Sequence, residues 1–164
     1  MRFSSSLVLL AVLCGCVDSP AKQSEPSVPT APALGKNANA DYSKPGPADP
    51  DAPKEFTETG SGLKYRLVRK TDGKKPIATD TVYACYRGTL DDGSEFDSSY
   101  KRGEPIEFPL SGVIPGWTEG LQYCPVGGMI ELDIPSELGY GERSMPGIPA
   151  GSRLHFLVEL VEIR

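Results

Sequence analysis

The sequence is poor in the residues from which metal centres and nucleophilic sites are built. Its single histidine is His155, and its four cysteines form no C-x-x-C pair. No serine lies in a G-x-S-x-G turn, which would mark a hydrolase nucleophile. We therefore expect no metal, no cofactor and no covalent intermediate in the activity of this chain.

Long apolar runs and an excess of basic charge are also absent. A membrane-spanning helix needs roughly 18 to 20 consecutive apolar residues, and no stretch of this chain reaches that length. The 17 Lys and Arg against 22 Asp and Glu give a formal net charge of −5, with both signs well mixed. A nucleic-acid partner would need a basic face, so we exclude one.

The N-terminus has the pattern of an export signal. Arg2 precedes a short apolar run over residues 7–13. The Leu-Cys-Gly-Cys sequence at residues 13–16 resembles a bacterial lipobox, which implies a lipoprotein signal peptide over residues 1–15 and acylation of Cys16. Val17, rather than an acid, follows the cysteine, which implies an outer-membrane anchor facing the periplasm. The alternative is an ordinary secreted protein whose cysteines are incidental.

Residues 16–54 have the composition of a linker. They are rich in Pro, Ala, Ser and Asn and contain almost no large apolar side chains. Such a segment cannot bury enough apolar surface to offset its ordering entropy, so we expect a disordered tether before a folded domain at residues 55–164. The tether has no apolar stripe of helical period, which a helical dimerisation region would show, and this favours a monomer.

The domain alternates in polarity as β-strands do. Apolar side chains occupy every second position in residues 63–67, 82–87, 129–134 and 154–160. An Asp-Asp-Gly sequence at residues 91–93 marks a tight turn. The one helix candidate is short and begins at Pro115, with Trp117 and Leu121 on one side. This pattern predicts an α+β fold in which an antiparallel half-barrel sheet wraps around one short helix.

Three strings in the domain closely resemble the FKBP-type peptidyl-prolyl isomerases. They are VYACYRGTLDDGSEFDSSY, PIEFPLSGVIPGWTEGL and ELGYGERSMPGIPAGSRLHF, in matching order over roughly the C-terminal two-thirds of the chain. The resemblance implies the same half-barrel fold. It also implies cis-trans rotation of X-Pro bonds in an apolar aromatic pocket.

The resemblance further implies roles for individual residues. Tyr86, Asp97 and Tyr140 would be catalytic, with Asp97 beside the rotating amide and bonded to the Tyr86 hydroxyl. Trp117 would form the floor beneath the proline ring. The other substrate-binding positions would be Phe96, Arg102, Ile106, Phe108, Val113, Ile114, Ile148 and Phe156. Core packing is the simpler alternative for any one aromatic alone, whereas their shared order favours a pocket.

Two cysteines, Cys85 and Cys124, lie in the domain. An exported fold permits a disulfide between them, although the strand alternation places Cys85 on the face opposite Tyr86. Cys124 can equally be a small buried hydrophobe. The sequence leaves both alternatives open, because the distance between the Cα atoms decides between them.

The leading hypothesis is a membrane-anchored peptidyl-prolyl cis-trans isomerase that acts on exported proteins as they fold. Uncatalysed X-Pro isomerisation takes roughly tens of seconds and can limit folding. The expected partners are folding proteins with X-Pro bonds, the membrane through the N-terminal lipid, and macrolide inhibitors such as FK506. The alternative is a chaperone or partner-binding module of the same fold, with incidental turnover.

Overall fold

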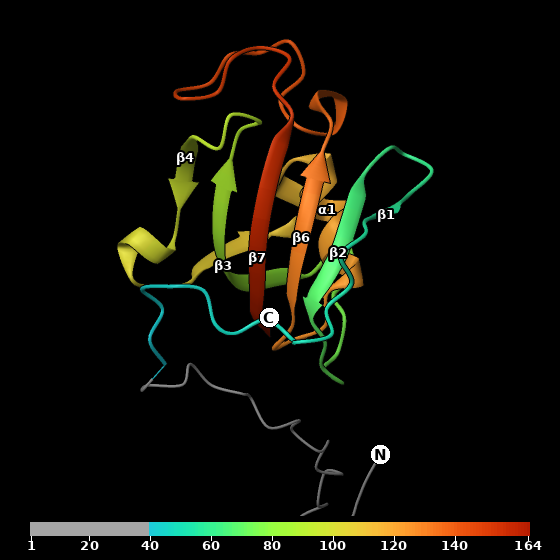
Figure 1. The fold of residues 1–164 in the computed structure, drawn as a ribbon, viewed down its shortest axis with the longest axis vertical. Helices are drawn as coiled ribbons and strands as arrows, with labels where there is room; N and C mark the ends of the chain where they lie inside the picture. The colour runs from blue at the N-terminus through green and yellow to red at the C-terminus, as the bar shows by residue number, and fades with distance from the viewer. Residues whose placement is uncertain (1–39) are drawn as a thin grey trace, which may run out of the picture. The chain divides into compact units, whose positions relative to one another are not determined.

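The computed structural model describes residues 40–164, and the signal segment and Cys16 lie outside them. In the described part, seven strands form one antiparallel sheet in the order β1-β2-β6-β7-β3-β4, with β5 also paired to β3 (Figure 1). The strands are β1 (Thr57–Glu58), β2 (Lys64–Arg69), β3 (Thr81–Thr89), β4 (Glu95–Ser98), β5 (Ile106–Pro109), β6 (Met129–Ile134) and β7 (Leu154–Ile163).

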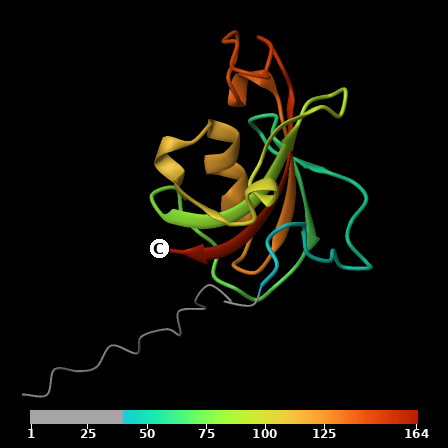
Figure 2. The same ribbon diagram turned by 90° about the vertical axis from the view of Figure 1, so that its left-hand side faces the viewer.

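One α-helix, α1 (Pro115–Gly120), packs on one face of this sheet (Figure 2). A Cβ atom at Gly116 would lie 2.5 Å from a side-chain carbon of Ile134, and one at Gly120 would lie 2.5 Å from Leu132. Only glycine therefore allows the helix to approach β6 so closely. The four short 3-10 helices in the described residues are η1 (Tyr100–Arg102), η2 (Leu110–Gly112), η3 (Leu121–Tyr123) and η4 (Ser136–Leu138). The predicted α+β half-barrel with one short helix is confirmed.

The core lies between α1 and the inner face of the sheet. The predicted alternation holds on the central strands, where the inward-facing residues are Val82, Ala84, Tyr86, Ile130, Leu132, Ile134, Leu154, Phe156, Val158 and Leu160. Glu131 and Asp133 stand between them and are partly exposed. Burial of this apolar face supplies most of the folding free energy, at roughly 25 cal/mol per Å².

The outer face of the sheet is drier than the alternation predicts. Tyr83 and Cys85 point away from the core, yet they are only 8% and 1% exposed. The Arg164 guanidinium lies 4.9 Å from the centroid of the Tyr83 ring. Cys85 stands opposite Glu159 in the β3–β7 register. Alternation alone would leave this face of an antiparallel sheet exposed to water, whereas a second layer of side chains covers this part of it.

Residues 46–54, here called the strap, run along that outer face (Figure 2). The Gly46 N–H donates to Glu159 Oε1 at 2.9 Å, and the Asp49 N–H donates to the Val68 carbonyl at 2.7 Å. The Asp49 carboxylate in turn accepts the Lys70 N–H at 2.8 Å. The predicted tether extended to residue 54, and the structure corrects this boundary. Composition did not reveal the strap, because backbone and carboxylate hydrogen bonds hold it rather than apolar burial.

Both cysteines of the domain are free and buried, so of the two alternatives that the sequence left open, the disulfide is not formed. Cys124 belongs to the core, whereas Cys85 faces the opposite side of β3. Burial raises the pKa of the Cys85 thiol to about 12, with a further contribution from the Glu159 carboxylate. Burial likewise raises the pKa of Cys124 to about 12. Neither thiol is therefore ionised at neutral pH, and Cys124 is the small buried hydrophobe of the second alternative.

Removal of the strap is predicted to destabilise the domain. A fragment of residues 55–164 should lose about 1 to 3 kcal/mol in its free energy of unfolding relative to residues 44–164, since each lost hydrogen bond contributes about 1 kcal/mol. Urea unfolding followed by Trp117 fluorescence measures the difference. The fragment 44–164 is the matched control because it retains every strap contact. Equal midpoints would show that the strap adds nothing to stability.

Candidate active site

A cavity of about 330 Å³ opens between the sheet and α1. Strands β3, β4, β5 and β7 contribute to its wall, together with the segment that leads into α1. Its lining residues are Tyr86, Phe96, Asp97, Phe108, Gly112, Val113, Ile114, Trp117, Tyr140 and Phe156. Nine of these ten were predicted from the sequence, and only Gly112 was not.

Trp117 stands at the centre of an aromatic cage. Its ring centroid lies 5.3 Å from that of Tyr86 and 5.2 Å from those of Phe108 and Phe156. Each pair meets edge to face, the geometry that the ring quadrupoles favour. The indole N–H is buried, and no other described residue accepts a hydrogen bond from it. The cage therefore offers a flat apolar surface with one unused donor.

The start of α1 places Trp117 in the cage. Pro115 occupies the first helical position, where a missing N–H costs nothing, and the Trp117 N–H donates to the Ile114 carbonyl at 2.9 Å. Gly116 and Gly120 lie four residues apart and face β6. Because these glycines hold one side of the helix against the sheet, Trp117 projects beside them into the cavity.

Asp97 forms the polar edge of the cavity. It accepts hydrogen bonds from the Tyr86 hydroxyl and, at 2.7 Å, from the Arg102 guanidinium, which also donates to the Tyr86 oxygen at 2.8 Å. Burial acts to raise the pKa of Asp97, but the bonds from Tyr86 and Arg102 outweigh it and hold the pKa below its usual value. Burial, together with the bond to Asp97, raises the pKa of Tyr86 to about 12. Tyr86 is therefore a neutral donor and Asp97 a carboxylate.

Ser99 fixes the backbone at Tyr86. Strand β5 pairs with the first half of β3 and β4 with its end, which leaves the Tyr86 edge without a strand partner. The Ser99 hydroxyl accepts the Tyr86 N–H at 2.8 Å, and the Ser99 N–H donates to the Tyr86 carbonyl at 2.9 Å. Ser99 is fully buried. Sequence reasoning missed this residue, although it directly follows the EFDS string of β4.

Three predicted site residues do not line the cavity. Arg102 acts on it only through Asp97 and Tyr86. Ile106 lies opposite Ala84 in the β3–β5 ladder and packs against the core. Ile148 is 5% exposed and exchanges two backbone hydrogen bonds of 2.8 Å with Met145. Substrate contacts by Ile106 and Ile148 stay predictions.

The described residues hold no group of three or more His, Cys, Asp or Glu side chains placed to bind a metal ion. Across residues 40–164, no helix has the length and apolarity needed to cross a membrane.

The fold and cavity define an α+β half-barrel domain with an aromatic-lined cavity between its sheet and its helix. Residues 72–161 match the family of FKBP-type peptidyl-prolyl cis-trans isomerases. The chain belongs to that family.

Relatives and solved structures agree with this assignment. The chain is 53% identical over 106 residues to the FKBP-type peptidyl-prolyl cis-trans isomerase FkpA of Escherichia coli, covering 65% of this chain and 39% of the relative. It is 45% identical over 105 residues to outer membrane protein MIP of Legionella longbeachae, covering 63% and 45%. The crystal structure of Escherichia coli FkpA superposes with a TM-score of 0.66 at 51% identity, covering 68% of this chain and 53% of that one. The chain thus spans less than half the length of these two curated relatives.

The carboxylate of Asp97 is predicted to stabilise the fold in a pH-dependent way. Its folded pKa is held below the ordinary value of 3.8, so its contribution is fully present above that pH and is lost as the pH falls through the folded pKa. The difference in free energy of unfolding between wild type and Asp97→Asn should therefore be constant near neutrality and shrink in acid.

Urea titrations at a series of pH values measure this difference. Asp72→Asn, at an exposed position outside the cavity lining, is the control and should show little difference at any pH. A gap for Asp97→Asn that widens in acid would contradict the assignment of Asp97 as a paired carboxylate.

Proposed function

We propose that the domain catalyses cis-trans isomerisation of X-Pro peptide bonds, and one observation carries this proposal. An aromatic cage floored by Trp117 stands beside a paired carboxylate, Asp97. A proline ring is apolar and would pack on the rings of this cage. The carboxylate and its neutral tyrosine partner would then face the adjoining amide of the bound peptide.

Such a site would lower the barrier to rotation by stabilising the twisted amide of the transition state more than the planar amide of the ground state. The barrier to rotation about the C–N bond is roughly 18 to 20 kcal/mol and arises from amide resonance. In the twisted transition state the nitrogen is pyramidal and the carbonyl is less dipolar, so a dry pocket favours it over the planar, well-hydrated ground state. Trp117 would hold the proline ring, while the Ile114 N–H and the Tyr140 hydroxyl would bind substrate carbonyls.

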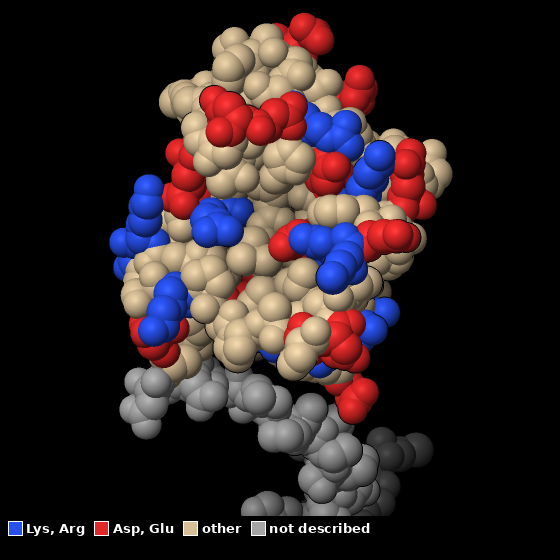
Figure 3. Space-filling model, in the orientation of Figure 1, with Lys and Arg blue, Asp and Glu red and all other residues tan. Residues whose placement is uncertain are grey.

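The substrates we infer are exported proteins that fold with X-Pro bonds still isomerising. The export pattern at the N-terminus supports this inference, and a relative carries the name outer membrane protein MIP. The proposed anchor is the lipid on Cys16, on a monomeric chain in the outer membrane. Charges of both signs are interspersed on the face in Figure 3, which supports the exclusion of nucleic acid as a partner.

Isomerisation of a short X-Pro peptide by residues 40–164 tests the activity. Trp117→Ala and Asp97→Ala should each lower kcat/KM at least about tenfold, because the first removes the floor and the second the charged edge. FK506 is expected to compete for the same cavity. Tyr65→Phe, outside the cavity lining, is the control and should be fully active.

Circular dichroism of each variant separates loss of the site from loss of the fold. A folded wild-type domain with no activity above the uncatalysed rate would refute the proposed catalysis. If that inactive domain still bound proline peptides, the protein would be a binding module of the same fold.

The lipid anchor is tested by labelling the full chain with palmitate in a bacterial host. Cys16→Ser should abolish the label and release the protein from the membrane fraction, because this residue supplies the acylated sulfur. Cys14→Ser is the matched control and should retain the label, since the bulky Leu13 precedes this cysteine. Persistent labelling of Cys16→Ser would contradict the proposed lipidation site.

A further inference from the structure

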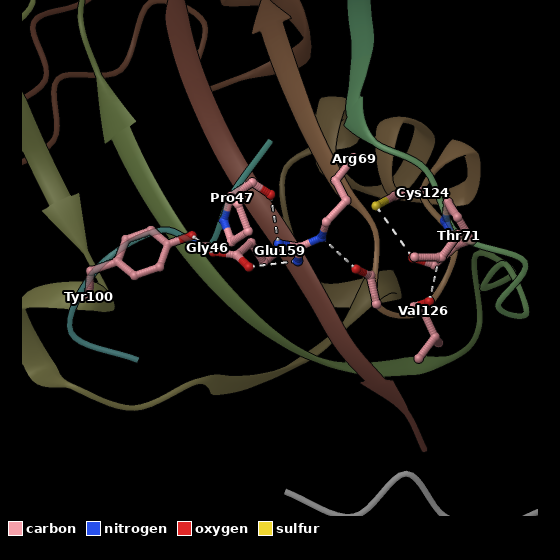
Figure 4. Close-up of polar contacts among 10 residues, drawn as sticks. Gly46, Pro47, Arg69, Thr71, Tyr100, Cys124, Val126 and Glu159 are labelled. Carbon is pink, nitrogen blue, oxygen red and sulfur yellow. Dashed lines mark hydrogen bonds and ion pairs between the residues drawn. The ribbon is translucent and has the colours of Figure 1, made fainter. Parts of the chain in front are cut away.

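Glu159 is a three-way acceptor on the face of the sheet opposite the cavity (Figure 4). Its Oε1 atom accepts the Tyr100 hydroxyl at 2.7 Å and the Gly46 N–H at 2.9 Å, while Oε2 accepts the Arg69 guanidinium at 2.7 Å. The side chain is only 14% exposed. A carboxylate so far from water is costly unless it is paired and hydrogen-bonded, so these donors are required and fix its orientation.

The donors around Glu159 are themselves held in place. Arg69 also donates from Nε to the Gly127 carbonyl at 2.9 Å and from Nη1 to the Pro47 carbonyl at 3.3 Å. A Cβ atom at Gly46 would lie 2.7 Å from Arg69 Nη1, so the strap approaches the guanidinium at close range. The cluster therefore links β2, β7 and the strap into one rigid acceptor site for Tyr100.

Tyr100 extends from η1 into this cluster, and its ring is 6% exposed. Burial, reinforced by the bond to Glu159, raises the pKa of the Tyr100 hydroxyl, so it remains a protonated donor. Two residues further on, Arg102 holds Asp97 and Tyr86 at the edge of the cavity. The single turn of η1 thus begins with Tyr100, which is bonded to Glu159 on the outer face of the sheet. It ends with Arg102, which is bonded to Asp97 and Tyr86 at the cavity.

Backbone hydrogen bonds tie the C-terminal end of η1 only to its own start: the Arg102 N–H donates to the Ser99 carbonyl at 2.9 Å, and the Gly103 N–H donates to the Ser99 and Tyr100 carbonyls at 3.1 Å. A three-residue 3-10 helix has poor hydrogen-bond geometry and adds little stability of its own. Ser99 secures its start through Tyr86, but Gly103 ends the turn with φ at 75°. Lys101 pairs with Glu95 at 2.7 Å, yet the lysine is 74% exposed and such a pair contributes little.

We propose that Tyr100 and Glu159 are positioning residues for the isomerase pocket, with their hydrogen bond holding η1 so that Arg102 stays on Asp97 and Tyr86. The catalytic part of this statement rests on the proposed function. Loss of the bond releases η1 from the outer face of the sheet. Arg102 then shifts, and the carboxylate and the tyrosine hydroxyl lose their common donor.

The test is the Tyr100→Phe variant of residues 40–164, which removes the hydroxyl and keeps the buried ring. We expect kcat/KM for an X-Pro peptide to fall at least about threefold, since small displacements at a site are costly. We also expect the pKa of Asp97, followed by carbon-13 NMR of its carboxyl group, to rise toward the ordinary value. Tyr65→Phe is the matched control, because it removes a hydroxyl from a ring stacked on Tyr123 outside the cavity lining.

A double-variant cycle separates positioning from general destabilisation. In an Arg102→Ala background, Tyr100→Phe should cause no further loss of kcat/KM, because the effect passes through Arg102, while the loss of stability should persist. Equal losses of activity in both backgrounds, or an unchanged Asp97 titration in Tyr100→Phe, would overturn the proposal. An inactive wild type would refute the proposed function, and the Asp97 titration would still decide whether Tyr100 positions the cluster.

Discussion

The close contact between α1 and β6 is the constraint on which the rest of the site depends. Gly116 and Gly120 allow Ile134 and Leu132 to reach the helix backbone, and this contact sets how deeply Trp117 enters the cavity. A side chain at either glycine would push the helix outward and open the floor. The cage distances near 5.2 Å between Trp117 and its neighbours follow from that contact. The apolar core and the binding floor are thus a single packing arrangement.

Strand β7 joins two environments through the alternation of its side chains. Phe156 and Val158 face the core, and Phe156 also lines the cavity. Glu159 faces outward and is surrounded by donors. The inner side needs a continuous apolar surface, and the outer side needs a charge that is fully paired. One strand meets both demands because its side chains alternate between the two faces of the sheet.

Much of this architecture could be read from the sequence, and what could not has identifiable causes. Strict alternation in residues 129–134 and 154–160 revealed the sheet, and the order of the aromatics revealed the cavity. The strap was missed because amino-acid composition indicates how much apolar surface a segment can bury, whereas backbone and carboxylate hydrogen bonds hold this segment in place. Burial of Cys85 was missed because alternation assigns a side chain to a face but cannot show what covers that face. The hydrogen bonds between Tyr86 and Ser99 could not be predicted, because only the folded chain brings these two segments together.

The charged group of the cavity, Asp97, lies at its rim and not on its aromatic floor. A carboxylate in the floor would have to be desolvated, and it would bind water or cations in place of a proline ring. Asp97 instead lies at the rim of the cavity with its side chain 43% exposed, so its carboxylate keeps part of its hydration. Hydrogen bonds from Arg102 and Tyr86 replace the water that the carboxylate has lost. The floor can then remain dry. In the proposed reaction, Asp97 would supply a charge of fixed direction beside the substrate amide, and the floor would keep the apolar character that favours a twisted bond. This charge keeps its direction only while Arg102 stays bonded to Asp97 and Tyr86. The proposed support of η1 by Tyr100 and Glu159 therefore bears directly on the site.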